Sequence, residues 1–186
     1  MIQALSLSSY GAALLFMQLL VQMPTPYPPE RVFTGADSYV EQPSISVAST
    51  PAEWNADWQR HMNVTPIGNI PGVTFPTAET PPSFDFDKYE LVVIFGGLAP
   101  VGGYSVVDSI QKDDHIYLRL QTLSLNPNGG PTPSSIKANP YAFIVYKRTP
   151  LPIVVEFPTQ LQDGSIQWNK VAQVGGSHQA GNSPQG

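Results

Sequence analysis

The chain contains no cysteine. This absence excludes disulfide bonds, thiolate metal sites, a cysteine nucleophile and the lipid-modified N-terminal cysteine of bacterial lipoproteins. Charge is also scarce, because Asp, Glu, Lys and Arg make up only 12% of the sequence, against a globular average of about 25%. The 9 Lys and Arg residues are scattered, so the basic stripe of a nucleic-acid-binding protein is missing. We therefore expect no nucleic-acid partner.

Proline and glycine are abundant instead, with 20 and 15 residues respectively. Such a composition favours short strands joined by stiff turns over long helices. A length of 186 residues with 41% apolar residues is enough for one domain with its own hydrophobic core. We therefore expect a single, mainly β domain.

The sequence divides into four parts: an apolar segment (1–23), a Pro-rich spacer (24–30), a β-rich domain (31–174) and a tail (175–186) of flexible-linker composition. Residues 1–23 carry no charged side chain, and their apolar run has the length of a signal-peptide core. No Lys or Arg precedes the run and no small-x-small cleavage site follows it. A signal, an anchor and a packing helix remain open, and an anchor would be the chain's membrane contact.

A helix is predicted to start at Thr50, which fits the N-cap position, with Pro51 at the first helical position and Glu53 at the reciprocal capping position. Trp54, Trp58 and Met62 follow at intervals of four. They give the helix one apolar face of about three turns, which we assign to the core.

Strands are predicted at residues 39–47, 89–95, 104–110, 115–123, 141–146, 153–157 and 165–171. Pro43 restricts the first of them to an edge or a bulge. Ile116, Leu118 and Leu120 alternate with polar residues, so one face of that hairpin packs and the other is wetter. The expected fold is an antiparallel β-sandwich or a partly open barrel with one short amphipathic helix.

No catalytic or metal-binding pattern emerges from the titratable residues, and we expect no enzyme activity and no cofactor. His61, His115 and His178 lack metal-ligand spacing, and His61 is expected as a favourable cation at the helix C-terminus. The carboxylates near the predicted turns are interpreted as solvated; they are Asp85, Asp87, Glu90, Asp113 and Asp114. Serine lies in no Gly-x-Ser-x-Gly elbow, and no helix follows the Gly-Gly pairs to form a phosphate loop.

Several segments in order resemble the C-terminal domain of the protease-complex subunit PrcB. They are Phe84-Asp85-Phe86, the strand from Leu91 to Gly96, Gly102-Gly103-Tyr104-Ser105-Val106, the strand from Asn139 to Val145, and the Trp-containing helix start from Glu53 to Trp58. The resemblance covers roughly residues 45–148. Val101 stands where the family usually has Thr, which weakens any role for a hydroxyl there.

The motif residues are interpreted as structural: Gly96, Gly102, Gly103, Tyr104, Pro140 and Tyr141. The glycines permit a reversal or a bulge before the next strand, and the Tyr104 hydroxyl is suited to capping a backbone group. The resemblance implies an exported bacterial protein (periplasmic, cell-surface or extracellular) that assembles or stabilises a partner complex such as a protease.

Three functions are compared. The first is a protein-binding assembly factor that uses exposed sheet edges and the loop at 126–139. Its candidate contact residues are Asn126, Pro127, Asn128, Pro131 and Pro133. The second is a subunit of an extracellular filament or surface assembly that polymerises through its N-terminal segment or by strand exchange. The third is a carbohydrate- or small-ligand-binding sandwich that uses Trp54, Trp58, Tyr117 or Trp168.

Overall fold

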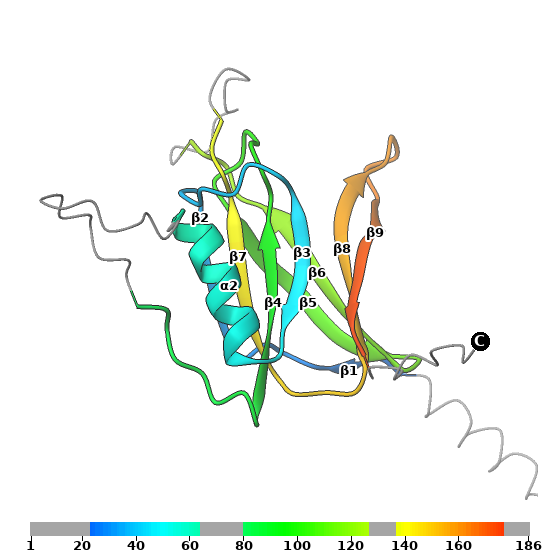
Figure 1. Cartoon of the computed structure of the whole chain (residues 1–186). Coiled ribbons are helices and arrows are strands. Elements are labelled where there is room, and N and C mark those ends of the chain that lie inside the picture. Colours follow the sequence, from blue (N-terminus) through cyan, green and yellow to red (C-terminus); the bar gives the residue numbers. More distant parts are fainter. Residues whose placement is uncertain (1–22, 64–79, 127–136, 177–186) are drawn as a thin grey trace, which may run out of the picture.

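The computed structural model describes residues 23–63, 80–126 and 137–176, which form two packed β-sheets with one helix against the outer face of the second sheet (Figure 1). Sheet A has the order β1 (Thr25–Pro26), β5 (Tyr104–Lys112), β6 (His115–Thr122), β8 (Pro152–Gln160) and β9 (Ile166–Gly175). Sheet B has the order β2 (Arg31–Gly35), β7 (Tyr141–Lys147), β4 (Tyr89–Phe95) and β3 (Ser44–Ala48). The helix is α2 (Pro51–Met62).

The expected mainly β sandwich with one short helix is confirmed, and the two sheets do not close into a barrel. One pairing departs from the antiparallel expectation, because β6 and β8 run parallel, with Ile116 opposite Ile153. Parallel neighbours need a crossover connection. Here β7, which belongs to sheet B, lies between them in the sequence.

Strand β4 has a continuous apolar run from Leu91 to Phe95 because both of its faces are covered there. Val92 and Ile94 face the core between the sheets, and Leu91, Val93 and Phe95 belong to a second core under α2. Such a run is typical of a strand buried on both sides. The predicted bounds of β4 match the structure, and the predicted alternation in β6 is confirmed by Ile116, Leu118 and Leu120, each 0% exposed.

The predicted start of α2 is confirmed. The Glu53 amide donates to Thr50 Oγ1 over 3.2 Å, and Glu53 Oε2 accepts from the Ser49 amide over 2.7 Å. The buried face differs in part from the prediction, since it consists of Trp54, Asp57 and His61, while Met62 is half-buried.

His61 does not act as the expected cation at the C-terminus of α2. Its side chain is 5% exposed and packs against the rings of Tyr141 and Phe143, at centroid distances of 4.3 and 5.1 Å. Burial lowers the pKa of the imidazole, because desolvation disfavours the charged form. His61 is therefore a neutral aromatic component of the core.

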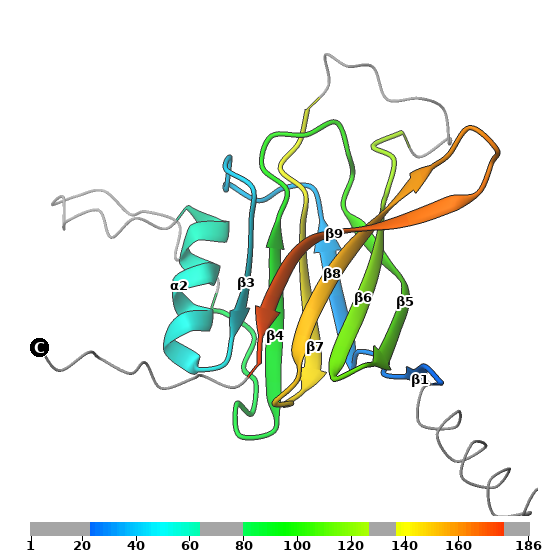
Figure 2. The ribbon, with the colours of Figure 1, turned by 90° about the vertical axis from the view of Figure 1, so that its right-hand side faces the viewer.

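Further segments differ from expectation, and β2 (Arg31–Gly35) is a strand that was not predicted. The first predicted strand of the domain starts at Ser44 rather than at residue 39, after Pro43, which has no N–H to donate. The last two strands are longer than predicted, and β8 and β9 form a hairpin that extends beyond the sandwich (Figure 2). The Pro-rich residues 24–30 contact the domain, since Thr25–Pro26 pair with β5 and the Tyr27 ring stacks on Tyr146 at 5.9 Å.

Candidate functional site

The predicted Gly-Gly-Tyr motif lies at one end of the sandwich, where the chain passes from sheet B to sheet A. The Gly96 amide donates to the Pro140 carbonyl over 2.8 Å, and a Cβ on Gly96 would overlap the Tyr104 hydroxyl. Gly103 has a φ of 129° and brings its backbone to Thr34. Gly102 donates to the Leu123 carbonyl over 2.7 Å, which joins the motif to the end of β6.

Thr34 of β2 connects this motif to sheet B, and the sequence analysis did not single it out. Its Oγ1 donates to the Tyr141 carbonyl and accepts from the Tyr104 amide, each over 2.9 Å. This bond from the Tyr104 amide to a side chain is not the capping by the hydroxyl that the sequence predicts. Its hydroxyl lies against Gly96, with no hydrogen bond to the backbone among the described residues. No pattern in the neighbouring residues identifies Thr34, because its hydrogen-bond partners are distant in sequence.

A cavity of about 390 Å³ opens beside the motif, between β3 and β9. We call it the edge slot. Its lining is mostly apolar and comes from both sheets: Pro43, Ser44, Ile45, Ile94, Phe95, Gly96, Tyr104, Phe157, Val171 and Ala172. Tyr104 and Phe157 meet edge to face, with ring centroids 5.6 Å apart. The slot exposes part of the core between the sheets to incoming side chains.

Both strands that border the edge slot have a free backbone edge. Among the described residues β3 pairs only with β4, and β9 pairs only with β8. The two strands meet near Val47, which a Cβ on Gly175 would approach to 3.7 Å, and they diverge towards Ser44 (Figure 2). An unpaired edge is a template for a further strand.

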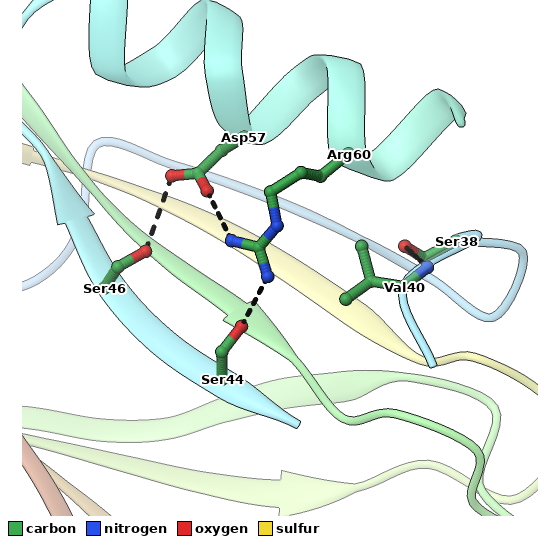
Figure 3. A network of polar contacts seen from close by, with 6 residues as sticks. All are labelled: Ser38, Val40, Ser44, Ser46, Asp57 and Arg60. Atoms are coloured by element: carbon green, nitrogen blue, oxygen red, sulfur yellow. Dashed lines mark hydrogen bonds and ion pairs between the residues drawn. The ribbon is translucent and has the colours of Figure 1, made fainter. Parts of the chain in front are cut away.

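A polar network fixes β3 against α2 (Figure 3). Asp57 accepts from Arg60 Nη1 over 3.1 Å and from Ser46 Oγ over 3.4 Å, while Arg60 Nη2 donates to Ser44 Oγ over 3.2 Å. Burial raises the pKa of Asp57, and the Arg60 charge opposes that shift. Because Ser44 and Ser46 point to the helix, Ile45 and Val47 point into the sandwich, as strand alternation requires.

The structure places most of the titratable residues considered in the sequence. No group of three or more His, Cys, Asp or Glu residues lies close enough to hold a metal ion in the described residues. His115 Nδ1 contacts the Asp113 carbonyl at 2.8 Å in the hairpin turn, and His178 lies outside the described residues. Glu90 is the exception to the solvated interpretation, because it is 5% exposed.

The other candidate surfaces are only partly described. Asn126 lies at the end of a described stretch, while Pro127, Asn128, Pro131 and Pro133 lie outside it. Trp54 is 2% exposed and therefore closed to a ligand. Trp58 packs against it, with ring centroids 5.5 Å apart.

Comparisons with protein-family models, with curated proteins and with solved structures found no match to this chain. The resemblance to the PrcB C-terminal domain thus stays a prediction from residues 45–148. Across the three described ranges, no helix combines the length and the apolar character that crossing a membrane requires. The edge slot and the two strand edges beside it, which have no backbone partner among the described residues, support a proposal for the function.

Proposed function

We propose that this chain is a non-enzymatic protein-binding module that captures an extended segment of another protein in the edge slot. The observation that carries the proposal is the apolar slot between two edge strands with free backbone edges. A segment that adds to the edge of β3 gains main-chain hydrogen bonds, and its alternate side chains enter a pocket, which is the mode of strand addition.

The dimensions of β3 set the length of the segment. The strand has 5 residues, which span about 16 Å at about 3.3 Å per residue. The partner segment therefore contains about four or five residues in the extended conformation. Because successive side chains of a strand point to opposite faces, every second residue of the segment would face the slot.

The volume and the lining of the edge slot also determine which side chains of the partner segment fit into it. Its volume of about 390 Å³ is at the lower end of the range for ligand pockets, about 300–1,000 Å³. Tyr104 and Phe157 form an aromatic wall, and Ile45 and Val171 lie on opposite sides of the opening. Val, Ile, Leu or Phe at the inward positions would bury apolar area there, which stabilises a complex by about 25 cal/mol per Å² before the costs of association.

The resemblance to the PrcB family indicates what the capture of a partner segment would serve. A module that holds one strand of a partner assembles or stabilises a complex, a protease among the candidates, at the exported location that the resemblance implies. The network of Asp57 and Arg60 supports this role, since it fixes β3 before a partner arrives. A rigid edge loses less conformational entropy on binding.

Self-association is the second candidate, and the β8–β9 hairpin favours it. The tip of this hairpin exposes Leu161 and Ile166, which are 42% and 61% exposed. A projecting hairpin with apolar side chains is a suitable donor for the edge slot of a second copy. Such an exchange would build a filament or surface assembly.

The test uses the full chain against an array of capped pentapeptides that alternate serine with Val, Ile, Leu or Phe. Val171→Lys places a charge at the slot, and Val107→Lys is the matched control on β5, since these valines are 52% and 49% exposed. We expect a subset of peptides to bind the wild type and the control, and to protect those amides of β3 that point away from β4 from hydrogen exchange.

If every peptide binds the Val171→Lys variant as well as the wild type, capture in the edge slot is refuted. Light scattering on the wild type, Val171→Lys and Val107→Lys distinguishes self-association from capture of another protein. A wild-type assembly that grows with concentration and is lost only in Val171→Lys, with no peptide bound, favours self-association.

A further inference from the structure

A second cavity lies at the opposite end of the sandwich from the edge slot, where β4 begins. Its volume is about 720 Å³. Its charged lining residues are Glu53, Glu90 and Arg148, and apolar wall is supplied by Val47, Pro150 and Val174. We call it the Glu90 cavity.

Glu90 points inward, between the two sheets. It lies on the same face of β4 as Val92 and Ile94, and its partner across the sheet is the fully buried Tyr146. The residue is 5% exposed, and in the described part of the chain a single hydrogen bond reaches its carboxylate, from the Thr149 amide over 3.4 Å. The sequence analysis placed Glu90 among solvated carboxylates, and the structure corrects this.

The neighbouring charges leave this carboxylate short of partners. Arg148 Nη1 donates to the Phe86 carbonyl over 2.8 Å, and the Glu53 carboxylate accepts from the Ser49 amide. Burial raises the pKa of Glu90, opposed by the Thr149 hydrogen bond and the Arg148 charge. A buried carboxylate normally accepts two or more hydrogen bonds or pairs with a cation, and Glu90, with one long bond from Thr149, can accept a further donor from the cavity.

We propose that the Glu90 cavity binds an alkylammonium group, with the ammonium on the Glu90 carboxylate and the aliphatic stem along Val47, Pro150 and Val174. With Glu53 at the rim, the lining holds two carboxylates and one guanidinium, so an organic cation is the complementary ligand. A metal ion fits less well, because no cluster of three acidic or histidine ligands exists in the described residues. An ammonium brings three donors and needs no fixed coordination shell.

Two sources supply this chemistry: a free alkylamine and a lysine side chain of a protein. The experiment follows amide chemical shifts of the full chain during titration with 1-aminobutane and, separately, with Nα-acetyl-lysine N-methylamide. 1-Butanol serves as the neutral control for both. We expect both amines to shift residues around Glu90, Thr149 and Val174, and 1-butanol to leave them unchanged.

The variants Glu90→Gln and Glu53→Gln separate the buried carboxylate from the rim. Each removes one negative charge, and glutamine retains the capping hydrogen bond at position 53. We expect Glu90→Gln to weaken amine binding about tenfold or more, because a charge-assisted hydrogen bond is lost. Glu53→Gln should change it less than threefold.

Binding should strengthen as the pH rises through the raised pKa of Glu90. Glu53 and Arg148 are the other charged groups that line the cavity. Equal shifts with 1-butanol and 1-aminobutane, or an equal loss in both variants, would overturn the proposal. Binding of the lysine derivative alone assigns the cavity to a protein lysine. Binding of 1-aminobutane alone assigns it to a free amine.

Discussion

The close packing around Gly96 supports a quantitative prediction for Gly96→Ala. An added Cβ would overlap the Tyr104 hydroxyl and would lie 2.7 Å from Pro140 Cγ. Pro140 is buried, and its carbonyl accepts the Gly96 hydrogen bond, so it gives way only if the start of β7 moves. Overpacking of this kind costs about 1–3 kcal/mol.

For a chain of this length, about 3 °C of melting temperature is lost per kcal/mol. We therefore expect thermal unfolding of Gly96→Ala to shift down by about 3–9 °C, measured by circular dichroism. Gly164→Ala is the matched control: it has a φ of 83°, but a Cβ there meets nothing within 4 Å. Its cost is the backbone strain of a left-handed alanine alone, about 1 kcal/mol.

A double variant, Gly96→Ala with Tyr104→Phe, tests whether the overlap with the Tyr104 hydroxyl causes the loss of stability. Tyr104→Phe removes only the hydroxyl, so it should restore part of the stability that Gly96→Ala loses, with a coupling energy of about 0.5–2 kcal/mol. It should restore nothing in Gly164→Ala. A Gly96→Ala protein as stable as the wild type, or one that Tyr104→Phe fails to improve, would refute the packing argument.

Three further predictions concern stability. Trp54→Ala should cost about 3–5 kcal/mol in denaturant unfolding, since the 2% exposed ring is packed against Phe143 at 5.0 Å. Thr50→Ala should cost about 1 kcal/mol, because the cap on the Glu53 amide is lost. Burial raises the pKa of Glu90, so this carboxyl stays protonated to a higher pH in the native state than in the unfolded state. The native state therefore loses stability as the pH rises through the raised pKa. Glu90→Gln should therefore be more stable than the wild type at pH 8, with a gain that fades below pH 4; an equal gain at both pH values would contradict this reasoning.

Local signals were sufficient for α2 and for the strands from β4 onwards, whereas β1 and β2 were not predicted. The Thr50-Pro51-Glu53 start of α2 depends on neighbouring residues, and the apolar run of β4 reflects burial on two faces. Partners far apart in sequence were not predictable from patterns. The Thr34 hydroxyl bonds residues 70 and 107 positions away, and the parallel pairing of β6 with β8 depends on which sheet each strand joins.

The candidate site was less predictable for the same reason. The edge slot combines β3, the end of β4, the start of β5 and the β8–β9 hairpin, and none of these segments carries a binding pattern alone. Glu90 was misjudged because it is the second residue of β4, and polar residues near the start of a strand are often solvated. Only the packing of sheet A over this face of β4 shows that the Glu90 side chain points inward.

The parallel pairing of β6 and β8 has a consequence for how the protein is made. In sheet A the strand β8 pairs on one side with β6 and on the other with β9, and it follows β7 of sheet B in the sequence. A ribosome that has released residues 1–150 has therefore made a chain whose β6 has an open apolar edge. That edge stays uncovered until β8 has been made, so chaperone binding should be strongest on nascent chains that end between β7 and β9.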